Sequence, residues 1–480
     1  MPSACAGWQW DVWWLNNKNK QPVKAAAAEM GVSTMSELKA GAPATIDEPY
    51  VGPVRSKERF SSIDIVRGVA LFGILLMNIV GFGHGLWYEE FQVETAAQGA
   101  NLWSWIITST FFEGTQRTLF SILFGAGVII LTSRAEKAGG GIGVADIYYR
   151  RNIWLIAFGM IDAYLLLWDG DILYYYGIVA LFLFPMRNML PKNLFIVGAL
   201  GLVALMGVYQ YDASEIQSKQ TDYVEAQAVL EAGGELDKEQ KEAIDSWEKA
   251  LKDFNFDEEV YAERVENHST SYMTLFKHHL PSISDGHGND LYRYLFLDVF
   301  SMMVIGMALL KLGVLTLERS TKFYWLMVLV GYGVGVPVSL WETNAVIAGG
   351  YGILSEVDTI WTYDIGRLGN ATGHLGLLLL FVRSGWLAWL QVRLAAVGRM
   401  ALTNYIMHSL IAMVVFLRPG FGLYGQLERY ELYYVVLAIC VFQLLASKPW
   451  LDRYRFGPLE WLWRSLTYLQ KQPMRHRVLT

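Results

Sequence analysis

Cysteine and charge are both scarce in this chain of 480 residues. Its two cysteines are Cys5, in a polar stretch, and Cys440, in an apolar stretch, which excludes a disulfide framework. Only 18% of the residues are charged while 53% are hydrophobic, a balance too apolar for a soluble protein with a largely polar surface. The net charge is −6, and we expect no nucleic acid among the partners. Composition instead indicates a protein that is embedded in a lipid bilayer.

Long apolar stretches recur along the chain and predict an all-α, polytopic membrane helix bundle. A helix needs about 20 residues to cross roughly 30 Å of hydrocarbon. Ten stretches have a suitable length and composition, and they lie near residues 63–83, 104–131, 152–168, 172–186, 194–210, 294–313, 323–341, 362–382, 396–417 and 432–448. We therefore expect about ten transmembrane helices.

Basic and acidic loops alternate between these stretches. Loops rich in Lys and Arg stay on the cytoplasmic side during insertion, so the alternation predicts a multi-pass protein with both termini in the cytoplasm. Residues 1–59 lack the pattern of a signal peptide and are expected to form a disordered cytoplasmic tail. The transmembrane domain is expected to span residues 60–470, and residues 471–480 would form a second cytoplasmic tail.

One acidic segment, residues 211–291, interrupts the transmembrane domain and is expected on the extracytoplasmic side. Gly233 and Gly234 divide it into two helical pieces, which favours a hairpin that caps the outer face of the bundle. A solvated spacer without a ligand-binding role is the alternative interpretation.

Polar side chains fall on single faces of the predicted spans. Asp64, Arg67 and Asn78 are separated by three and eleven residues and so share one face of the first helix. Glu113 and Arg117 lie four residues apart in the second span and can neutralise each other. Charged groups at membrane depth usually face a bundle interior or a wet cavity. These faces therefore predict a hydrated central cleft.

The later spans and the outer turn carry polar groups of the same kind. One face of the eighth span carries Asp364, Arg367, Asn370 and His374. One face of the ninth carries Asn404 and His408. The third span and the turn after it carry Asp162, Asp169 and Asp171. Interhelical hydrogen bonds that hold the bundle together are the alternative for each residue taken alone. A cleft accounts better for several one-sided faces together.

Arginines gather toward the predicted cytoplasmic end, namely Arg67, Arg134, Arg150, Arg151 and Arg399. Such a mouth suits an anionic ligand such as a nucleotide diphosphate or coenzyme A, although part of this charge is the orientation signal itself. His374 and His408 are the only histidines within the predicted spans, and each is a candidate general base or nucleophile as well as a candidate core histidine. No spacing of histidines or carboxylates predicts a metal site.

Five ordered motifs resemble the YeiB-like family, known as domain of unknown function 418, over about residues 60–470. They are DIVRGVALFGILLMNI, RTLFSILFGAG, GDILYYYGIVALF, GRMALTNYIMHSL and GPLEWLWRSLTY. The resemblance implies a place in the bacterial cytoplasmic (inner) membrane. The YeiB-like family is in turn similar to membrane acyltransferases, including the heparan-alpha-glucosaminide N-acetyltransferases and the acyltransferase-three family.

The wider similarity implies an activity. An acyl-CoA would bind from the cytoplasm as co-substrate, with no tightly bound cofactor, and its acyl group would pass to a hydroxyl or amine of an envelope glycan or lipid outside. The Asp-x-x-Arg-Gly opening corresponds to Asp64, Arg67 and Gly68, and places Arg67 near the donor's phosphates. The acyltransferase-three pattern has a His at the position of Asn78 in this chain. The glucosaminide branch has a His near the start of its second helix, where this chain has Glu113 and no histidine. His374, His408 or a carboxylate would then have to supply the base.

These inferences give three hypotheses of function. The first is an acyltransferase, whose donor would bind to Asp64, Arg67, Arg150, Arg151 and Arg399. His408 or His374 would act as base, and Asp171 or Asp364 would orient the base or the acceptor. The cavity would be lined by Asn78, Glu113, Arg117, Arg367 and Asn404. The second is a transporter or flippase for an anionic lipid or metabolite. The third is a non-enzymatic scaffold of an envelope complex, docking through the acidic segment.

Overall fold

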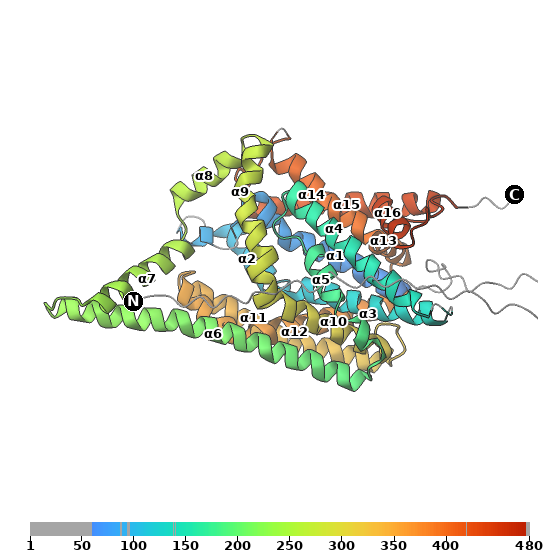
Figure 1. Cartoon of the computed structure of the whole chain (residues 1–480), viewed down its shortest axis with the longest axis horizontal. Coiled ribbons are helices and arrows are strands. Elements are labelled where there is room, and N and C mark those ends of the chain that lie inside the picture. Colours follow the sequence, from blue (N-terminus) through green and yellow to red (C-terminus); the bar gives the residue numbers. More distant parts are fainter. Residues whose placement is uncertain are drawn as a thin grey trace, which may run out of the picture. The chain divides into compact units, whose positions relative to one another are not determined.

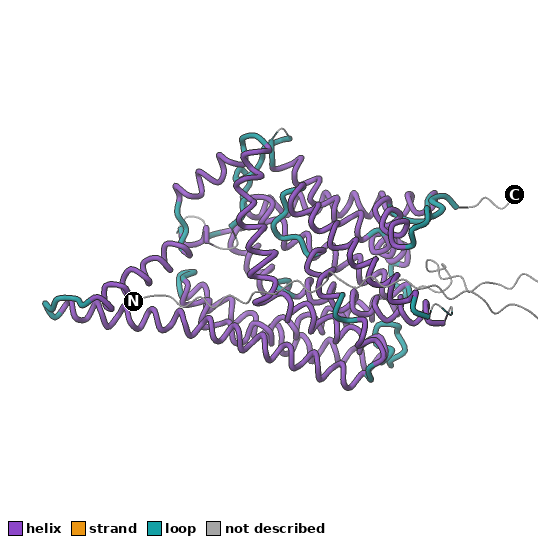
Figure 2. Tube along the Cα trace, viewed as in Figure 1, coloured by secondary structure: helices purple, strands orange, loops and turns teal. Residues whose placement is uncertain are grey.

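The computed structural model describes residues 60–86, 89–93, 97–137, 139, 141–418 and 420–476. The predicted tail 1–59 lies outside the described residues. The helices, in chain order, are α1 (Ser61–Gly83), η2 (Glu89–Gln92), α2 (Gly99–Phe111), α3 (Thr115–Lys137), α4 (Gly143–Leu165), α5 (Leu173–Ala180), η3 (Phe184–Asn188), α6 (Pro191–Glu231), α7 (Lys238–Phe254), α8 (Glu258–His268), α9 (Tyr272–Asp285), η4 (Gly286–Leu295), α10 (Phe296–Lys311), α11 (Thr321–Ala348), α12 (Ile353–Ser384), α13 (Ala388–Arg399), α14 (Ala401–Phe416), α15 (Arg429–Arg453) and α16 (Pro458–Thr467). Figures 1 and 2 show this all-α architecture, in which the described part of the chain forms no strand.

Seven of the described helical segments are long and apolar enough to cross a membrane, or eight if the bent pair α13 and α14 counts as one span. Their outward faces carry large apolar side chains that are more than 60% exposed, including Leu200, Val203, Leu329 and Leu437. Lipid is the environment that accepts such faces. The chain is therefore a membrane protein. The count of ten spans and the location of both termini in the cytoplasm stay predictions.

The predicted spans at 152–168 and 172–186 differ from the other eight. The first corresponds to α4, whose charged residues include Asp146, Arg150 and Arg151. The second contains α5, which is only eight residues long and is followed by turns and by η3. Neither belongs to the seven or eight candidate spans, because one carries several charges and the other is short.

Two other boundaries differ from the sequence expectation. The span predicted at 104–131 is broken into α2 and α3, and Glu113 lies in the break between them. Residue 211 is no boundary, because α6 runs without interruption through it for 41 residues. The predicted division at the glycines is confirmed: α6 ends at Glu231, Gly233 adopts φ +77°, and α7 folds back against α6, while the cap over the outer face stays a prediction. Figure 1 shows α6 along one side of the bundle and reaching beyond it, with α7 turning back from its far end at an angle toward α8.

The centre of the bundle is built around α1, which packs on α3, α13, α14 and α15. The contact with α13 depends on two glycines. A Cβ atom added to Gly398 would lie 1.9 Å from the carbonyl oxygen of Asp64, and one added to Gly68 would lie 2.3 Å from that of Leu394. This close crossing explains the glycine of the Asp-x-x-Arg-Gly motif. It also brings the first turns of α1 beside Arg399 at the end of α13.

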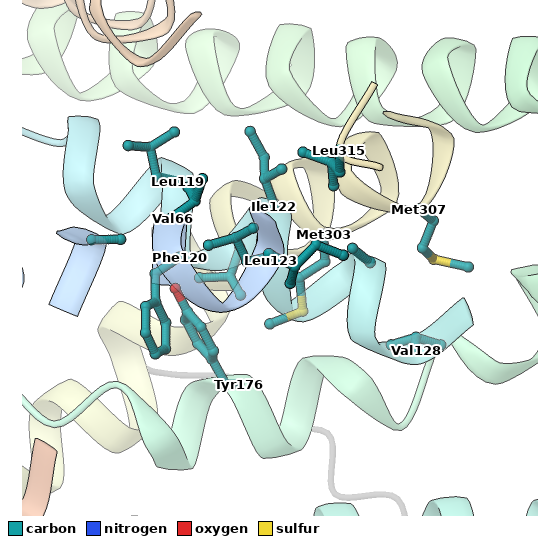
Figure 3. Packing of buried hydrophobic residues seen from close by; sticks show 14 of the residues in the cluster. Val66, Leu119, Phe120, Ile122, Leu123, Val128, Tyr176, Met303, Met307 and Leu315 are labelled. Carbon is teal, nitrogen blue, oxygen red and sulfur yellow. The ribbon is translucent and has the colours of Figure 1, made fainter. Parts of the chain in front are cut away.

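The largest apolar cluster joins α1, α3, α4, α5 and α10. Figure 3 shows part of it, with Val66 of α1, Leu119 and Leu123 of α3, and Met303 of α10 packed around one point. Tyr176 of α5 enters the same cluster and is only 1% exposed. The core therefore fixes α5 against α3, and this contact determines the geometry of the site.

Candidate functional site

A cavity of about 890 Å³ opens among the start of α1, the end of α3, the start of α4 and the end of α13. We call it the arginine cavity, because its cationic lining residues are Arg67, Arg134, Lys137, Arg151, Arg399 and Arg464. Apolar residues line its other part, among them Phe120, Leu123, Leu155 and Leu173. Phe120 and Arg134 are about 21 Å apart along α3, from a rise of 1.5 Å per residue. The cavity is thus cationic at one end and apolar at the other.

Local contacts hold its arginines in place. Arg67 Nη1 donates to Asp64 Oδ1 at 2.9 Å and to the carbonyl oxygen of Gly398 at 3.3 Å, which ties α1 to α13. The Arg151 guanidinium lies over the ring of Trp463 in α16, 4.3 Å from its centroid. Trp463 Nε1 in turn donates to the carbonyl oxygen of Arg151 at 2.8 Å. The predicted donor-site residues Asp64, Arg67, Arg151 and Arg399 all line this cavity.

Arg150, the remaining predicted donor-site residue, does not line it. Neighbouring residues on a helix point about 100° apart, so Arg150 and Arg151 face different directions. Arg150 Nη2 instead donates to Asp146 Oδ2 at 2.5 Å, one turn earlier on α4. The structure separates this arginine from the other four residues.

A second cavity, of about 580 Å³, lies at the other end of α1, α3 and α4. We call it the histidine cavity, because His268, His278 and His279 of the acidic segment line it. The predicted cavity residues Asn78, Glu113 and Arg117 line it as well, together with Trp168 and Asp169 from the turn before α5. The acidic segment thus forms part of a cavity wall, through α8 and α9.

Tyr176 lines both cavities, so a layer only one side chain thick separates them at this point. Its hydroxyl group is 2.6 Å from Ser121 Oγ and donates to the carbonyl oxygen of Arg117 at 3.3 Å. Its ring lies 5.9 Å from that of Phe120, and Figure 3 shows it reaching from α5 toward α3. The Tyr405 hydroxyl, from α14, accepts a hydrogen bond from the backbone N–H of Ile172 at 3.1 Å. We call this layer, formed by Ile172, Leu173, Tyr176 and Tyr405, the divider.

Two fully buried carboxyl groups, Asp162 and Asp171, lie beside the divider. They are close enough to interact with each other and with Tyr405. Asp171 Oδ2 accepts a hydrogen bond from the backbone N–H of Tyr174 at 2.8 Å, which fixes the first turn of α5. Gly159 permits this approach, because a Cβ atom there would lie 2.3 Å from the nitrogen of Tyr174. The motif GDILYYYG therefore positions the divider.

Arg117 interacts electrostatically with Glu113, but its ion pair is with another residue. It donates through Nε to Asp298 Oδ2 at 3.0 Å, because the break between α2 and α3 moves Glu113 off the helical face of Arg117. Asp298 Oδ1 also accepts from Arg367 Nη2 at 2.5 Å, and Arg367 Nε donates to Asp364 Oδ1 at 2.6 Å. These four residues form a buried ionic network that joins α3, α10 and α12.

The other predicted residues lie in helix contacts and line neither cavity. Arg367 and Asp364 belong to the ionic network. His374 Nδ1 is 2.7 Å from the carbonyl oxygen of Asn370, and its ring lies between those of Phe112 and Tyr332. His408 Nε2 is 3.2 Å from Gln443 Oε1, and Asn404 donates to Val397 O and Ser447 Oγ at 3.2 and 3.3 Å. The two predicted histidines are therefore apart from each other and from both cavities.

Sequence reasoning missed Asp298, Tyr176 and the pair His268 and His279. Asp298 had a signal, since it is a carboxylate inside the predicted span 294–313 and such residues are functional candidates. Tyr176 lies in the motif GDILYYYGIVALF, but its place between two cavities depends on how α5 packs. The histidines had only a sequence position, in a segment whose fold over the bundle no periodicity reveals.

Comparison with known proteins identifies the family of the chain. The profile of the family described as "Protein of unknown function (DUF418)" matches residues 309–470. The uncharacterized protein YxaH of Bacillus subtilis (strain 168) is 30% identical over 434 residues, covering 88% of this chain and 97% of its own length. The uncharacterized protein YeiB of Escherichia coli (strain K12) is 28% identical over 436 residues, covering 85% and 96%. No solved structure matches the chain.

Fold and cavities together define the class: a helical, multi-pass membrane protein with two internal cavities separated by a short helix. Within that class, the chain belongs to the YeiB-like DUF418 family. Its relatives are bacterial proteins, and the alignment extends over nearly their whole length.

Proposed function

We propose that the protein transfers an acyl group across the bacterial cytoplasmic membrane, from an acyl-CoA in the arginine cavity to a hydroxyl or amine acceptor in the histidine cavity. The observation that carries the proposal is the end-to-end arrangement of the two cavities on either side of Tyr176. In this orientation the arginine cavity faces the cytoplasm, as the distribution of Lys and Arg predicts.

The arginine cavity has the chemistry that a coenzyme A thioester requires. Arginine binds phosphate with paired, charge-assisted hydrogen bonds, and four arginines beyond Arg67 line the cavity. The apolar part toward Phe120 and Leu173 suits the uncharged arm and the acyl group. The volume of about 890 Å³ is that of a pocket for a large small-molecule ligand.

The predicted roles of Asp171 and Asp364 stay proposals, whereas His374 and His408 lie in contacts that keep them away from both cavities. Asp171 adjoins the divider and orients the first turn of α5, so we propose it as a positioning group for the acyl end of the donor. His374 and His408 would have to leave their hydrogen bonds to reach a cavity. Replacing each by Ala should therefore leave acyl transfer intact, and loss of transfer in either variant would return that histidine to the site.

Transport without covalent change is the second candidate, and the divider favours it. A thin layer between two oppositely placed cavities is what alternating access requires, and a shift of α5 would switch the open side. The substrate would be an anionic lipid or metabolite held by the arginines. Release of CoA thiol in purified protein distinguishes acyl transfer from transport.

The test of the donor site is binding of acetyl-CoA and longer acyl-CoAs to detergent-purified protein, measured by thermal shift. Arg67→Ala and Arg151→Ala should each weaken binding by about ten- to hundred-fold, because a hydrogen bond to a charged group is worth roughly 1.5–3 kcal/mol. Arg187→Ala is the matched control, since Arg187 pairs with Glu136 outside both cavities.

The variant Arg150→Ala distinguishes the structure from the sequence-based prediction that Arg150 binds the donor. The structure predicts binding as in wild type, because Arg150 turns away toward Asp146. No thermal shift with any acyl-CoA, in wild-type protein that unfolds cooperatively, would overturn the acyltransferase proposal.

A further inference from the structure

Three histidines from the acidic segment meet at the histidine cavity. His268 is the last residue of α8, and His278 and His279 lie on α9. The Nε2 atoms of His268 and His279 are 3.2 Å apart, within hydrogen-bond distance. When two imidazoles are hydrogen-bonded to each other, one ring nitrogen must donate and the other must accept. The groups around the two rings determine which nitrogen carries the hydrogen.

The backbone fixes the proton of His268. Its Nδ1 atom is 2.7 Å from the carbonyl oxygen of Arg264, and a carbonyl oxygen can only accept, so Nδ1 carries the hydrogen. Burial, followed by the charges of His279, His278 and Arg264, lowers the pKa of His268 to about 3. The ring is therefore neutral near pH 7. With its only proton on Nδ1, His268 presents a lone pair at Nε2.

The proton order of His279 follows from that of His268. Because His268 Nε2 accepts, His279 Nε2 must donate, and the neutral His279 ring then carries its lone pair on Nδ1. No hydrogen bond joins this Nδ1 to any residue in the described part of the chain, and His279 lines the cavity. The imidazole thus holds a free basic nitrogen.

Rigid neighbours surround the pair. The ring of Tyr424 stacks on His268 with centroids 3.5 Å apart and an interplanar angle of 7°. Arg264 Nη1 donates to the carbonyl oxygen of Gly85 at 2.9 Å, which anchors α8 to the end of α1. Asp169, which accepts from Ser282 Oγ at 3.3 Å, is near enough to His279 to stabilise a positive charge on that ring.

We propose that His279 is the general base of the histidine cavity and that His268 is its positioning residue. The inference rests on the proposed acyl transfer. The acceptor would be a hydroxyl or amine compound that reaches Nδ1 of His279 from the outer side. As its proton moves to Nδ1, the acceptor oxygen or nitrogen bonds to the acyl carbon, the carbon–sulfur bond of the thioester breaks, and the departing thiolate takes up a proton to give CoA thiol.

The activity test uses acetyl-CoA as donor and ethanolamine, which offers one hydroxyl and one amine, as acceptor. Release of CoA thiol from purified full-length protein is measured together with acetyl-CoA binding. His279→Gln should lower kcat by about 10²- to 10⁴-fold, the usual contribution of a general base, with unchanged acetyl-CoA binding. His476→Gln is the matched control, because His476 contacts Leu451 O and lines neither cavity.

The test of His268 needs a measurement that a general loss of folded structure would not change in the same way. His268→Ala should lower kcat while the KM for acetyl-CoA stays as in wild type. His268→Gln should restore part of the rate, because a side-chain amide has both a donor group and an acceptor group, as the neutral ring does.

Labelling with diethyl pyrocarbonate at pH 7 tests the proton order without any turnover. Mass spectrometry should find His279 modified and His268 protected, since both nitrogens of His268 are in hydrogen bonds. The opposite pattern overturns the inference, and so does a His279→Gln variant that releases CoA as wild type does. Wild-type protein that neither binds acetyl-CoA nor releases CoA overturns the proposed function and the catalytic role with it, while the labelling still decides whether His279 holds a free basic nitrogen.

Discussion

The two cavities share Tyr176 and yet are built in different ways. The arginine cavity takes its charges from side chains of the bundle helices α1, α3, α4, α13 and α16. The histidine cavity is completed by α8 and α9, which belong to the acidic segment. A cavity assembled from the bundle and a cavity closed by a separate segment can change independently. If the two cavities hold donor and acceptor as proposed, related proteins should share the donor more readily than the acceptor.

The largest expected effect is on the ionic network behind the histidine cavity. Arg367→Met leaves the buried carboxylates Asp298 and Asp364 without the guanidinium that they share. Removing one partner of a buried pair costs about 3–5 kcal/mol, so the free energy of unfolding should fall by that amount. Thermal unfolding in detergent measures the loss.

A matched double variant, Arg367→Met with Asp364→Asn, tests the cause of this loss. It should recover much of the stability, because Asp298 keeps its ion pair with Arg117 and no unpaired charge stays buried. Equal stability of the single variant and the wild type would show that the network does not support this side of the bundle.

The next effect concerns the divider. Tyr176→Ala should join the two cavities, since this side chain lines both. The chain has only two cysteines, so a background without cysteine is simple to make, and Asn78→Cys then reports on the histidine cavity. In proteoliposomes, a charged thiol reagent on the side of the arginine cavity should modify this cysteine only in the Tyr176→Ala background.

Tyr176→Phe is the control for this experiment, because it keeps the ring and loses only the hydrogen bonds of the hydroxyl group. Labelling as fast in Tyr176→Phe as in Tyr176→Ala would mean that the ring is not the barrier.

Much of the arginine cavity could be predicted from the sequence. Asp64 and Arg67 lie three residues apart on one helix, and Arg399 lies in a quoted motif, so periodicity and the distribution of charge located them. The prediction for Arg150 did not hold for this cavity, because a run of two arginines does not reveal which one faces inward. Glu113 and Arg117 do interact electrostatically, but the ion pair of Arg117 is with Asp298, because a helix break at residues 112–114 is not visible in an apolar pattern.

The histidine cavity could be predicted only in part. Asn78 and Glu113 were expected in a cleft and line this one. The approach of His268 to His279 depends instead on how α8 and α9 turn over the bundle, which short-range patterns do not encode. The same holds for Asp298, whose partners come from α3 and α12, about 180 and 70 residues away in the chain.

A smaller effect is expected from pH. The pKa of His268 is lowered to about 3 from an ordinary value of 6.5, so between these values the unfolded chain binds a proton that the folded chain does not. Stability should therefore fall as the pH drops below about 6.5. His278, His279, Arg264 and Tyr424 surround the group, and the first three add positive charge that opposes its protonation.

The measurement is the midpoint of thermal unfolding at pH 7.5 and pH 5.0 for wild type and His268→Gln. Glutamine does not titrate, so the variant should lose less stability on acidification than the wild type. Identical pH dependence in both proteins would remove His268 as a cause.

The smallest effect is expected at the tip of the α6–α7 hairpin. Gly233 adopts φ +77°, and an L-residue in this conformation costs roughly 1–2 kcal/mol, so Gly233→Ala should loosen the hairpin locally. Hydrogen exchange should become faster at the end of α6 and the start of α7, whereas acetyl-CoA binding should not change, because the hairpin contributes no residue to the arginine cavity. Weaker acetyl-CoA binding in this variant would show that the acidic segment and the donor site are coupled, and would remove the independence of the two cavities.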